Sequence, residues 1–251
     1  MNKNNGHALC YSTAPAPLGP FTYQGVLVSL GRDNENQVHS TAYGGNTHGG
    51  IFTVNGRWFV NYHRQTGDFF PARQSCMAEL TMTANGRFLQ APFSTQVERT
   101  GELMPGAKIP AYSACVLTDR RGRTKKHTQS PYFTMRGPNL AAEGIQQAVT
   151  GLSGGCSVGF KYFNFGTVEK IWQAGVLLKN AKKGRIDIFI DTGTWENKIC
   201  IIPVRENRMI PLWIFGATVP VFGIHTLLFC FYGQGKTTNF ISFIVAKGER
   251  I

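Results

Sequence analysis

The feature that most constrains the fold is a hairpin signal in the first quarter of the chain. Asn55-Gly56 stands between two segments that alternate apolar and polar residues, Ile51–Val54 and Trp58–His63. Asn-Gly favours a two-residue turn because both positions tolerate a positive φ, and such a turn matches the twist of paired strands. The sequence therefore predicts a β-hairpin, with His48 entering its first strand and His63-Arg64 leaving its second.

The composition favours β-structure for the rest of the chain. With 29 Gly, 12 Pro and 12% aromatic residues, it suits many short strands joined by turns. No long stretch repeats its apolar residues with the 3.6-residue period of an amphipathic helix. The best helical candidate is the short segment Glu143–Val149. We therefore expect an all-β protein, and 251 residues leave room for one large or two ordinary domains.

The second half of the chain is a series of short apolar or alternating segments separated by turns. Strands at this regular spacing predict an antiparallel β-sandwich or jelly roll. The candidate strands are Ser157–Phe163, Glu169–Val176, Arg185–Ile190, Ile199–Val204, Trp213–Val219, Ile224–Tyr232 and Phe240–Val245.

Two segments that suggest other functions are better explained as parts of these sheets. The nearly uncharged run Ile210–Tyr232 is about long enough to cross a bilayer, but it divides into two strand-length pieces at Val219–Gly223. We expect two adjacent core strands there and no membrane helix. Gly233–Thr238 resembles the end of a phosphate-binding loop, yet Cys230 stands where that motif needs its first Gly. We expect a turn between strands.

Several spaced motifs of the first half follow one another in a fixed order. They are Pro17-Leu18-Gly19-Pro20-Phe21 with Tyr23 and Gly25, His48-Gly49-Gly50, Trp58, Tyr62-His63-Arg64, Arg73-Gln74 through Ala78-Glu79, Pro110-Ala111-Tyr112 and Ala114-Cys115. In this order they resemble glycoside hydrolase family 43, whose catalytic unit is a five-bladed β-propeller. The resemblance covers roughly residues 8–118, which would be the closing blades of a partial propeller.

The resemblance implies three acidic residues, a general base, a general acid and a carboxylate that tunes the acid, on blades that precede Tyr11–Phe21. Inverting hydrolysis needs two carboxylates flanking the scissile bond, and no residue of this chain matches them. We therefore expect no catalytic residue here. The resemblance implies a C-terminal fragment of an inverting arabinofuranosidase or xylosidase acting on hemicellulose such as xylan, with the missing N-terminal blades as a partner.

Two residues of the first half are candidates for sugar binding. In the family, the His that matches His48 lies near the propeller axis and helps to organise a central water or ion. Arg64 should point towards the same centre, where its planar guanidinium suits a sugar hydroxyl or a carboxylate. Without the family, His48 would be expected to satisfy a backbone group at a strand end and Arg64 to lie at the surface. Glu79 is the structural partner that we expect for Arg64.

The second half carries its own set of matching residues. They are Val158 through Phe163 with Phe165-Gly166, Gly184 with Ile186 and Ile188, Lys198-Ile199, Ile202-Pro203-Val204, Gly223-Ile224-His225 with Leu227, Phe229 and Phe231, and Asn239-Phe240. They resemble a carbohydrate-binding module of family 6, which stacks a sugar between aromatic rings in a loop-built cleft. Asn239 matches the Asn that hydrogen-bonds the sugar, and Tyr162 is the nearest matching aromatic residue.

The chain departs from the module's pattern in two places. The second stacking ring should lie shortly before Trp213, where the sequence has Arg208–Leu212 without an aromatic residue. Acidic residues that help to hold a structural calcium are replaced by Ser242 and Ile244, and calcium needs oxygen ligands. The family implies calcium as a cofactor, but its ligands look degraded here, so we assign no metal site.

These resemblances predict three parts. Residues 1–118 form the end of the propeller, residues 119–130 form a basic linker, and residues 131–251 form the sandwich. The linker holds the densest basic cluster, Arg120–His127. It lacks the interleaved aromatic residues that stacking on single-stranded nucleic acid would require.

The net charge of +12 at pH 7 leaves two alternatives to a glycosidase fragment. One is a non-catalytic carbohydrate-binding protein in which only the sandwich is active. The other is a basic adhesion or nucleic-acid-binding protein, because basic surfaces attract polyanions. The leading hypothesis predicts a polysaccharide partner of the arabinoxylan or arabinan type, without nucleic acid and without a membrane.

The six cysteines are scattered and form no C-x-x-C pair. That spacing excludes the usual zinc and thioredoxin-type motifs, and we expect buried free thiols. The N-terminal residues lack the apolar core of a signal peptide. The family resemblance nevertheless implies an extracellular or periplasmic location for the intact protein.

Overall fold

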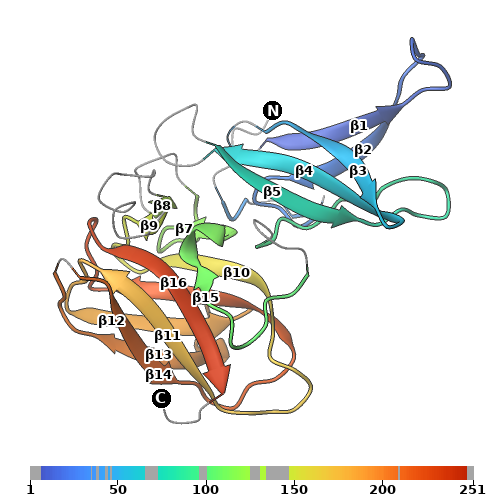
Figure 1. Ribbon diagram of the computed structural model, residues 1–251. Helices are drawn as coiled ribbons and strands as arrows, with labels where there is room; N and C mark the ends of the chain where they lie inside the picture. Colours follow the sequence, from blue (N-terminus) through green and yellow to red (C-terminus); the bar gives the residue numbers. More distant parts are fainter. Residues whose placement is uncertain are drawn as a thin grey trace.

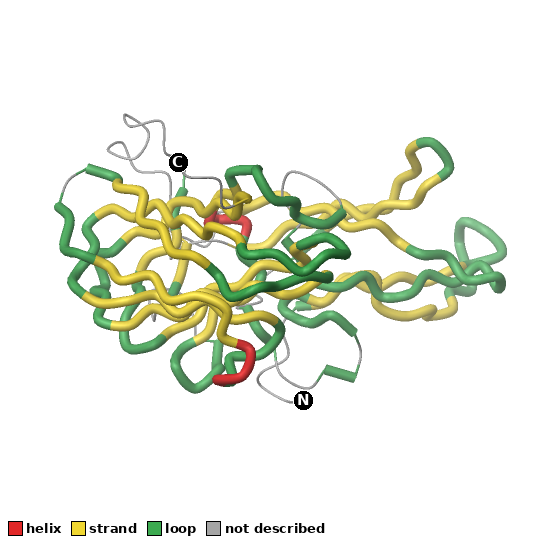
Figure 2. Tube along the Cα trace, turned by 90° about the horizontal axis from the view of Figure 1, so that it is seen from below, coloured by secondary structure: helices red, strands yellow, loops and turns green. Residues whose placement is uncertain are grey.

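The computed structural model of the chain describes residues 7–34, 36–37, 40–42, 45, 47–65, 73–95, 101–124, 131–133, 147–208 and 210–247. Strands and loops make up nearly all of this part of the chain (Figure 2). The helical residues belong to two 3-10 turns, η1 (Ala111–Ser113) and η2 (Trp195–Asn197). The predicted all-β fold is confirmed.

The strands gather in two lobes (Figure 1). The first lobe holds an antiparallel ribbon and a three-stranded antiparallel sheet in the order β3-β4-β5. The ribbon consists of β1 (Ala8–Thr13) and β2 (Thr22–Ser29), and the sheet of β3 (Gly49–Val54), β4 (Arg57–Gln65) and β5 (Arg73–Leu80).

The predicted hairpin is confirmed as β3 and β4. Asn55 and Gly56 have φ values of 49° and 74°, the positive values that their turn requires. The pleat of β4 directs alternate residues to one face. Val60 and Tyr62 lie on that face and are buried against Ala78 and Cys76 of β5. The hairpin thus supplies one wall of the first lobe's core.

The second lobe is a β-sandwich of two antiparallel sheets, as expected. One sheet has the order β13-β12-β15-β10-β7 and the other β14-β11-β16-β9-β8, with the short strand β6 beside β16. The strands are β6 (Ile109–Pro110), β7 (Val116–Thr118), β8 (Tyr132–Phe133), β9 (Val149–Thr150), β10 (Cys156–Asn164), β11 (Trp172–Lys179), β12 (Gly184–Ile190), β13 (Lys198–Val204), β14 (Leu212–Ala217), β15 (Ile224–Tyr232) and β16 (Asn239–Lys247).

Phenylalanines from both sheets fill the sandwich core. Phe160 and Phe229 come from one sheet, and Phe240 and Phe243 from the other, and all four are fully buried. The ring centroids of Phe160 and Phe243 are 4.5 Å apart, and those of Phe229 and Phe240 are 5.4 Å apart. Aromatic rings bury large areas, and contacts at these distances add to the gain from burial.

The segments that suggested other functions are parts of the sandwich. Ile210–Tyr232 contains two strands, as expected, but β14 and β15 belong to different sheets and are not neighbours. Gly233–Thr238 connects β15 to β16, which confirms the predicted turn. No helix of the described residues is long and apolar enough to cross a membrane. Most of the helical candidate Glu143–Val149 lies outside the described residues, and Val149 begins β9.

The boundary expected at residue 118 does not coincide with the start of the sandwich. β7 pairs with β10, and β6 pairs with β16. Leu103 and Ala111 are also buried in the sandwich core. The apolar residues of this segment find both their hydrogen-bonding partners and their core in the second lobe. Of the expected linker, the part that is described forms a turn in which Asp119 accepts hydrogen bonds from Arg123.

The two lobes share a packed junction. Val116 belongs to the first lobe's core although its strand lies in the sandwich, and Leu228 of β15 packs against the same core. Backbone hydrogen bonds also cross the junction: Leu117 N donates to Thr41 O at 2.8 Å, and Thr95 N donates to Lys161 O at 2.9 Å.

All six cysteines are free thiols, and the expected burial is confirmed for five of them. Cys10 is exposed, and the other five cysteines are buried. Burial raises the pKa of Cys156 to about 12 and that of Cys200 to about 11, which suppresses the reactive thiolate. In a thiol titration of the native protein at pH 8, only Cys10 should react rapidly, and the other five should react after unfolding. Cys10→Ser should abolish the rapid phase, whereas a rapid phase that survives this change would contradict the buried placement.

Candidate functional site

His48 lies exposed at the entry to the first lobe's sheet, beside a second histidine. Its ring centroid is 5.3 Å from that of His63 on the neighbouring strand β4. The Nε2 atom of His63 is buried and has no hydrogen-bond partner among the described residues. Burial, followed by the charges of Arg73 and His48, lowers the pKa of His63. The imidazole of His63 is therefore favoured in its neutral form, with Nε2 not engaged in a hydrogen bond to the described residues. The expected position of His48 near a propeller axis stays a prediction.

Arg64 lies in the junction and not at an open surface. It alternates with Val60 and Tyr62 on the buried face of β4, and its side chain is almost fully buried. Its Nη1 donates to Ala114 O at 2.6 Å and its Nη2 donates to Tyr112 O at 2.7 Å. These contacts favour a structural role for Arg64, and its expected role in sugar binding stays a prediction.

The prediction that Glu79 pairs with Arg64 is wrong. Glu79 pairs with Arg57 instead, through both of its carboxylate oxygens. On β4, Arg64 follows Arg57 by an odd number of positions, so the pleat turns the two side chains to opposite faces. Arg64 meets a neutral amide, because its Nε donates to Gln74 Oε1 at 2.6 Å.

The structure does not bring Tyr162 and Asn239 together, which corrects the expectation of one cleft containing both. Tyr162 lies near the end of β10 where Asn164 pairs with Ile224. Asn239 begins β16, after the turn that leaves the other end of β15. Because β15 is extended over its whole length, these two positions lie at opposite ends of the sandwich.

The surroundings of Tyr162 are those of the junction. Its side chain is half-buried, and burial, followed by the charge of Asp33, raises the pKa of its phenol. Its backbone carbonyl accepts a hydrogen bond from Leu103 N at 2.7 Å. Its role in sugar binding stays a prediction.

Two aromatic residues that the sequence analysis did not select share a sheet face with Asn239. On strand β11, which lies between β14 and β16, Gly175, Leu177 and Lys179 alternate with core residues, so they face away from the core. Their register partners include Phe215 for Gly175, Trp213 for Leu177 and Asn239 for Lys179. Trp213, Phe215 and Asn239 therefore lie on this outer face, which we call the platform face.

The rings of the platform face are nearly parallel. The Trp213 and Phe215 centroids are 5.8 Å apart, with 20° between the ring planes. A Cβ at Gly175 would lie 2.4 Å from Phe215 Cε1, so this glycine lets the Phe215 ring lie flat over the strand. The signal in the sequence was the alternation of Trp213 and Phe215, which places both rings on one side of a strand.

Unpaired polar atoms accompany the two rings. Gln173 Oε1 and Ser242 Oγ are buried and have no hydrogen-bond partner among the described residues. Gln173 precedes Gly175 by two positions, and Ser242 pairs with Leu177, so both belong to the platform face. The Asn239 amide and the two parallel rings can together bind a ligand that has both hydroxyl groups and an apolar ring face.

Comparisons with known proteins show which proteins the chain resembles. A xylosidase/arabinosidase of Thermoclostridium stercorarium is 30% identical over 248 residues, which cover 92% of this chain and 50% of that protein. This chain is homologous to xylosidase/arabinosidases over most of its length. A second xylosidase/arabinosidase, from Bacteroides ovatus, is 33% identical over 89 residues, or 33% of this chain and 23% of the relative. No protein-family model matches the chain.

The fold of this homologue is also found in a solved family 43 structure. A glycoside hydrolase family 43 arabinoxylan arabinofuranohydrolase from Bacillus subtilis, solved with cellotetraose, has a TM-score of 0.51 and 22% identity. The match covers 96% of this chain and 47% of that enzyme. The chain thus spans about half the length of this enzyme and of the Thermoclostridium stercorarium relative. That the first lobe is part of a five-bladed propeller stays a prediction.

The structural calcium that the resemblance to a carbohydrate-binding module of family 6 implies does not fit the residues at the matching positions of this homologue. Ile244 has no side-chain oxygen, and Ser242 offers a single neutral hydroxyl on the platform face. Calcium prefers six to eight oxygen ligands, several of them carboxylates. No group of three or more His, Cys, Asp or Glu side chains suited to a metal ion occurs among the described residues.

Proposed function

We propose that this homologue binds hemicellulose of the arabinoxylan or arabinan type and is the carbohydrate-binding part of a glycoside hydrolase. The observation that carries the proposal is the shared face of Asn239, Trp213 and Phe215. Its wider support is the homology to xylosidase/arabinosidases over 92% of the chain. A location outside the cell, where polysaccharides are met, is part of this proposal.

The chemistry of the platform face suits a neutral sugar. Aromatic rings offer large flat areas to the apolar face of a sugar ring. The Asn239 amide has both donors and an acceptor, so it can bind two neighbouring hydroxyl groups at once. Parallel rings 5.8 Å apart can contact successive sugar units of one extended chain.

Hydrolysis is the part of the proposal that needs residues from outside this chain. Inversion requires an acid and a base on opposite sides of the bond, and the resemblance assigns neither to a residue here. Several carboxylates of the described residues are already neutralised: Glu79 by Arg57, Asp33 by Lys161 and Asp187 by Arg185. We propose that cleavage of arabinofuranosidic or xylosidic bonds depends on a longer polypeptide that supplies the catalytic carboxylates.

Depletion by insoluble arabinoxylan tests the binding function. Trp213→Ala and Asn239→Ala should each weaken retention about tenfold or more, which corresponds to at least ~1.4 kcal/mol. Trp195→Ala is the matched control, because Trp195 is 75% exposed in a different loop, beyond the far end of β12. Free xylose and arabinose oligomers should compete with the wild-type protein at moderate salt.

Other outcomes would select one of the alternatives. Unchanged retention of the Trp213 and Asn239 variants would contradict the platform face as the binding site. Binding that falls steeply with salt but ignores sugar competitors would instead support the basic adhesion or nucleic-acid-binding hypothesis, because counterion release makes such binding salt-dependent.

A further inference from the structure

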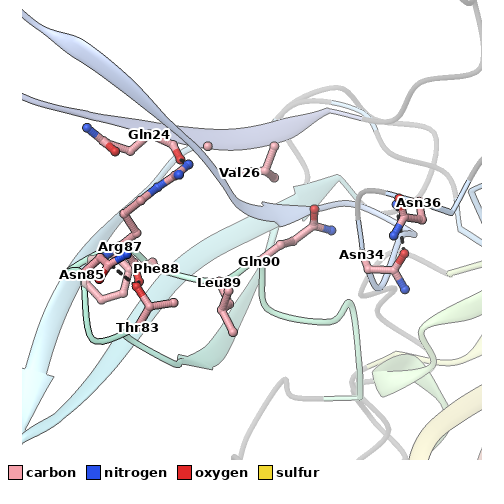
Figure 3. Close-up of a pocket in the computed structure, with 11 residues that line it drawn as sticks. Gln24, Val26, Asn34, Asn36, Thr83, Asn85, Arg87, Phe88, Leu89 and Gln90 are labelled. Carbon is pink, nitrogen blue, oxygen red and sulfur yellow. Dashed lines mark hydrogen bonds between the residues drawn. The ribbon is translucent and has the colours of Figure 1, made fainter.

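A separate pocket lies in the first lobe, far along the chain from the platform face. Its volume is about 520 Å³, and it lies between the β1–β2 ribbon and residues 82–91 (Figure 3). Five carboxamide side chains line it: Gln24, Asn34, Asn36, Asn85 and Gln90. The pocket volume is within the range of sites that hold small molecules.

The wall formed by residues 82–91 is fixed to the ribbon by backbone contacts. Ala91 N donates to Leu27 O at 2.8 Å, which continues the ribbon's edge. Thr83 closes a turn, since its hydroxyl accepts from Arg87 N at 3.1 Å and donates to Arg87 O at 3.0 Å. The Arg87 guanidinium then crosses to the ribbon, where Nη2 donates to Gln24 O at 2.6 Å (Figure 3). The pocket is therefore held from both sides.

Several of the carboxamides have unused hydrogen-bonding groups. Gln90 Nε2 is buried and has no partner among the described residues. Asn34 uses its oxygen to accept from Asn36 N at 3.0 Å, which leaves its amide nitrogen available. Gln24 uses its nitrogen to donate to Thr13 Oγ1 at 2.8 Å, which leaves its oxygen available. A buried donor without a partner is costly, and a ligand acceptor would remove that cost.

The charge and shape of the pocket restrict the ligand. Among the described residues that line the pocket there is no carboxylate, and Arg87, the single charged residue of this lining, already binds Gln24 O. Phe88 adds an aromatic ring that is held edge-on by Tyr11 and Trp58, with centroid distances of 5.6 and 5.2 Å. Carboxamides beside an aromatic ring match a ligand with neutral hydroxyl groups and an apolar ring face.

We infer that this pocket is a second carbohydrate site, which takes one or two units of a neutral sugar chain. It uses none of His48, Arg64, Tyr162 or Asn239, and none of the platform-face residues. Its occupation therefore does not depend on the proposed function of the sandwich. A polysaccharide that binds to both sites at once would bind the protein more strongly than either site alone would allow.

Titration with xylotriose and with arabinotriose, followed by the side-chain amide signals in NMR, tests this inference. In the background of Trp213→Ala with Asn239→Ala, xylotriose or arabinotriose should still shift the amide signals of Asn85 and Gln90. These signals are assigned by their loss in Asn85→Ala and Gln90→Leu. Each pocket variant should weaken the remaining binding about tenfold. The control is Asn61→Ala, because Asn61 is at an exposed strand position, and this variant should leave sugar binding unchanged. Asn207→Ala is not suited as a control, because the Asn207 side chain hydrogen-bonds Leu178 O and Ala181 N.

Three results would overturn the inference. The first is the absence of any shift of the Asn85 and Gln90 signals with either sugar. The second is binding that the pocket variants leave unchanged. The third is a stronger response to inorganic phosphate than to both sugars, which would assign the pocket to an anion. None of these results bears on retention through Trp213 and Asn239, so failure of the pocket and failure of the platform face are distinguishable.

Discussion

Arg64→Ala should lower the free energy of unfolding by about 3–5 kcal/mol, because it removes a buried cation and leaves buried acceptors unpaired. The side chain is 2% exposed and donates to Gln74 Oε1, Ala114 O and Tyr112 O. These bonds join β4 of the first lobe to the segment around η1. The measurement is urea unfolding followed by tryptophan fluorescence.

A matched change on the same strand controls for the loss of an arginine. Arg57→Ala removes an exposed guanidinium from the Glu79 pair, where solvent screens the interaction, so stability should change little. If both variants lose the same small amount of unfolding free energy, the buried contacts of Arg64 do not stabilise the junction. If Arg64→Ala keeps full stability but loses retention on arabinoxylan, the expected sugar-binding role of Arg64 would be correct after all.

Lys161→Met should lower the free energy of unfolding by about 3 kcal/mol or more, because it leaves Asp33 without its cation. Lys161 Nζ lies 2.7 Å from Asp33 Oδ2, and the two side chains are 8% and 23% exposed. The other carboxylate oxygen, Oδ1, is buried and has no partner among the described residues. This ion pair joins β10 of the sandwich to the loop after β2.

A double-mutant cycle isolates the Lys161–Asp33 interaction. Asp33→Asn should also lower the free energy of unfolding. The double variant should lose less unfolding free energy than the two single variants together, with a coupling energy of about 1–3 kcal/mol. Additive losses would contradict a direct interaction. Equilibrium unfolding of the four proteins provides the measurement.

The pH dependence of this coupling has a definite sign. Burial by itself opposes the charge of Lys161, but the neighbouring Cys115 and Asp33 outweigh it and raise the pKa of the lysine above 10.5. A raised pKa in the folded state stabilises the protein fully below the unfolded value. The coupling should therefore persist at neutral pH and be lost only as the pH rises above the usual lysine range.

Local sequence patterns were sufficient to predict most strands of the protein. The alternation around Asn55-Gly56 predicted the β3–β4 hairpin, because strand pleating and turn geometry both act over a few residues. In the same way, the expected strand Ile224–Tyr232 coincides with β15. Positions that alternate within one strand could also be assigned to opposite faces without knowledge of the fold.

Contacts between distant segments could not be predicted from such patterns. Arg64 looked like a site residue because it ends a strand, but its acceptors lie near residues 112 and 114. The sequence analysis placed those residues in the same lobe as Arg64, whereas β6 and β7 on either side of them pair with the sandwich. Burial of Arg64 follows from that pairing.

By itself, the sequence determined the all-β class, the hairpin, the sandwich strands and the family resemblance, since these depend on residue order and short-range periodicity. The tertiary structure alone decided which residues share a surface. It separated Tyr162 from Asn239 because β15 runs the length of the sandwich between their ends. It placed Asn239 and Trp213 on the same face, because β11 lies between β14 and β16 and its pairing with both strands fixes which of their residues face outward. Strand order is set by core packing between sheets, which no single segment contains.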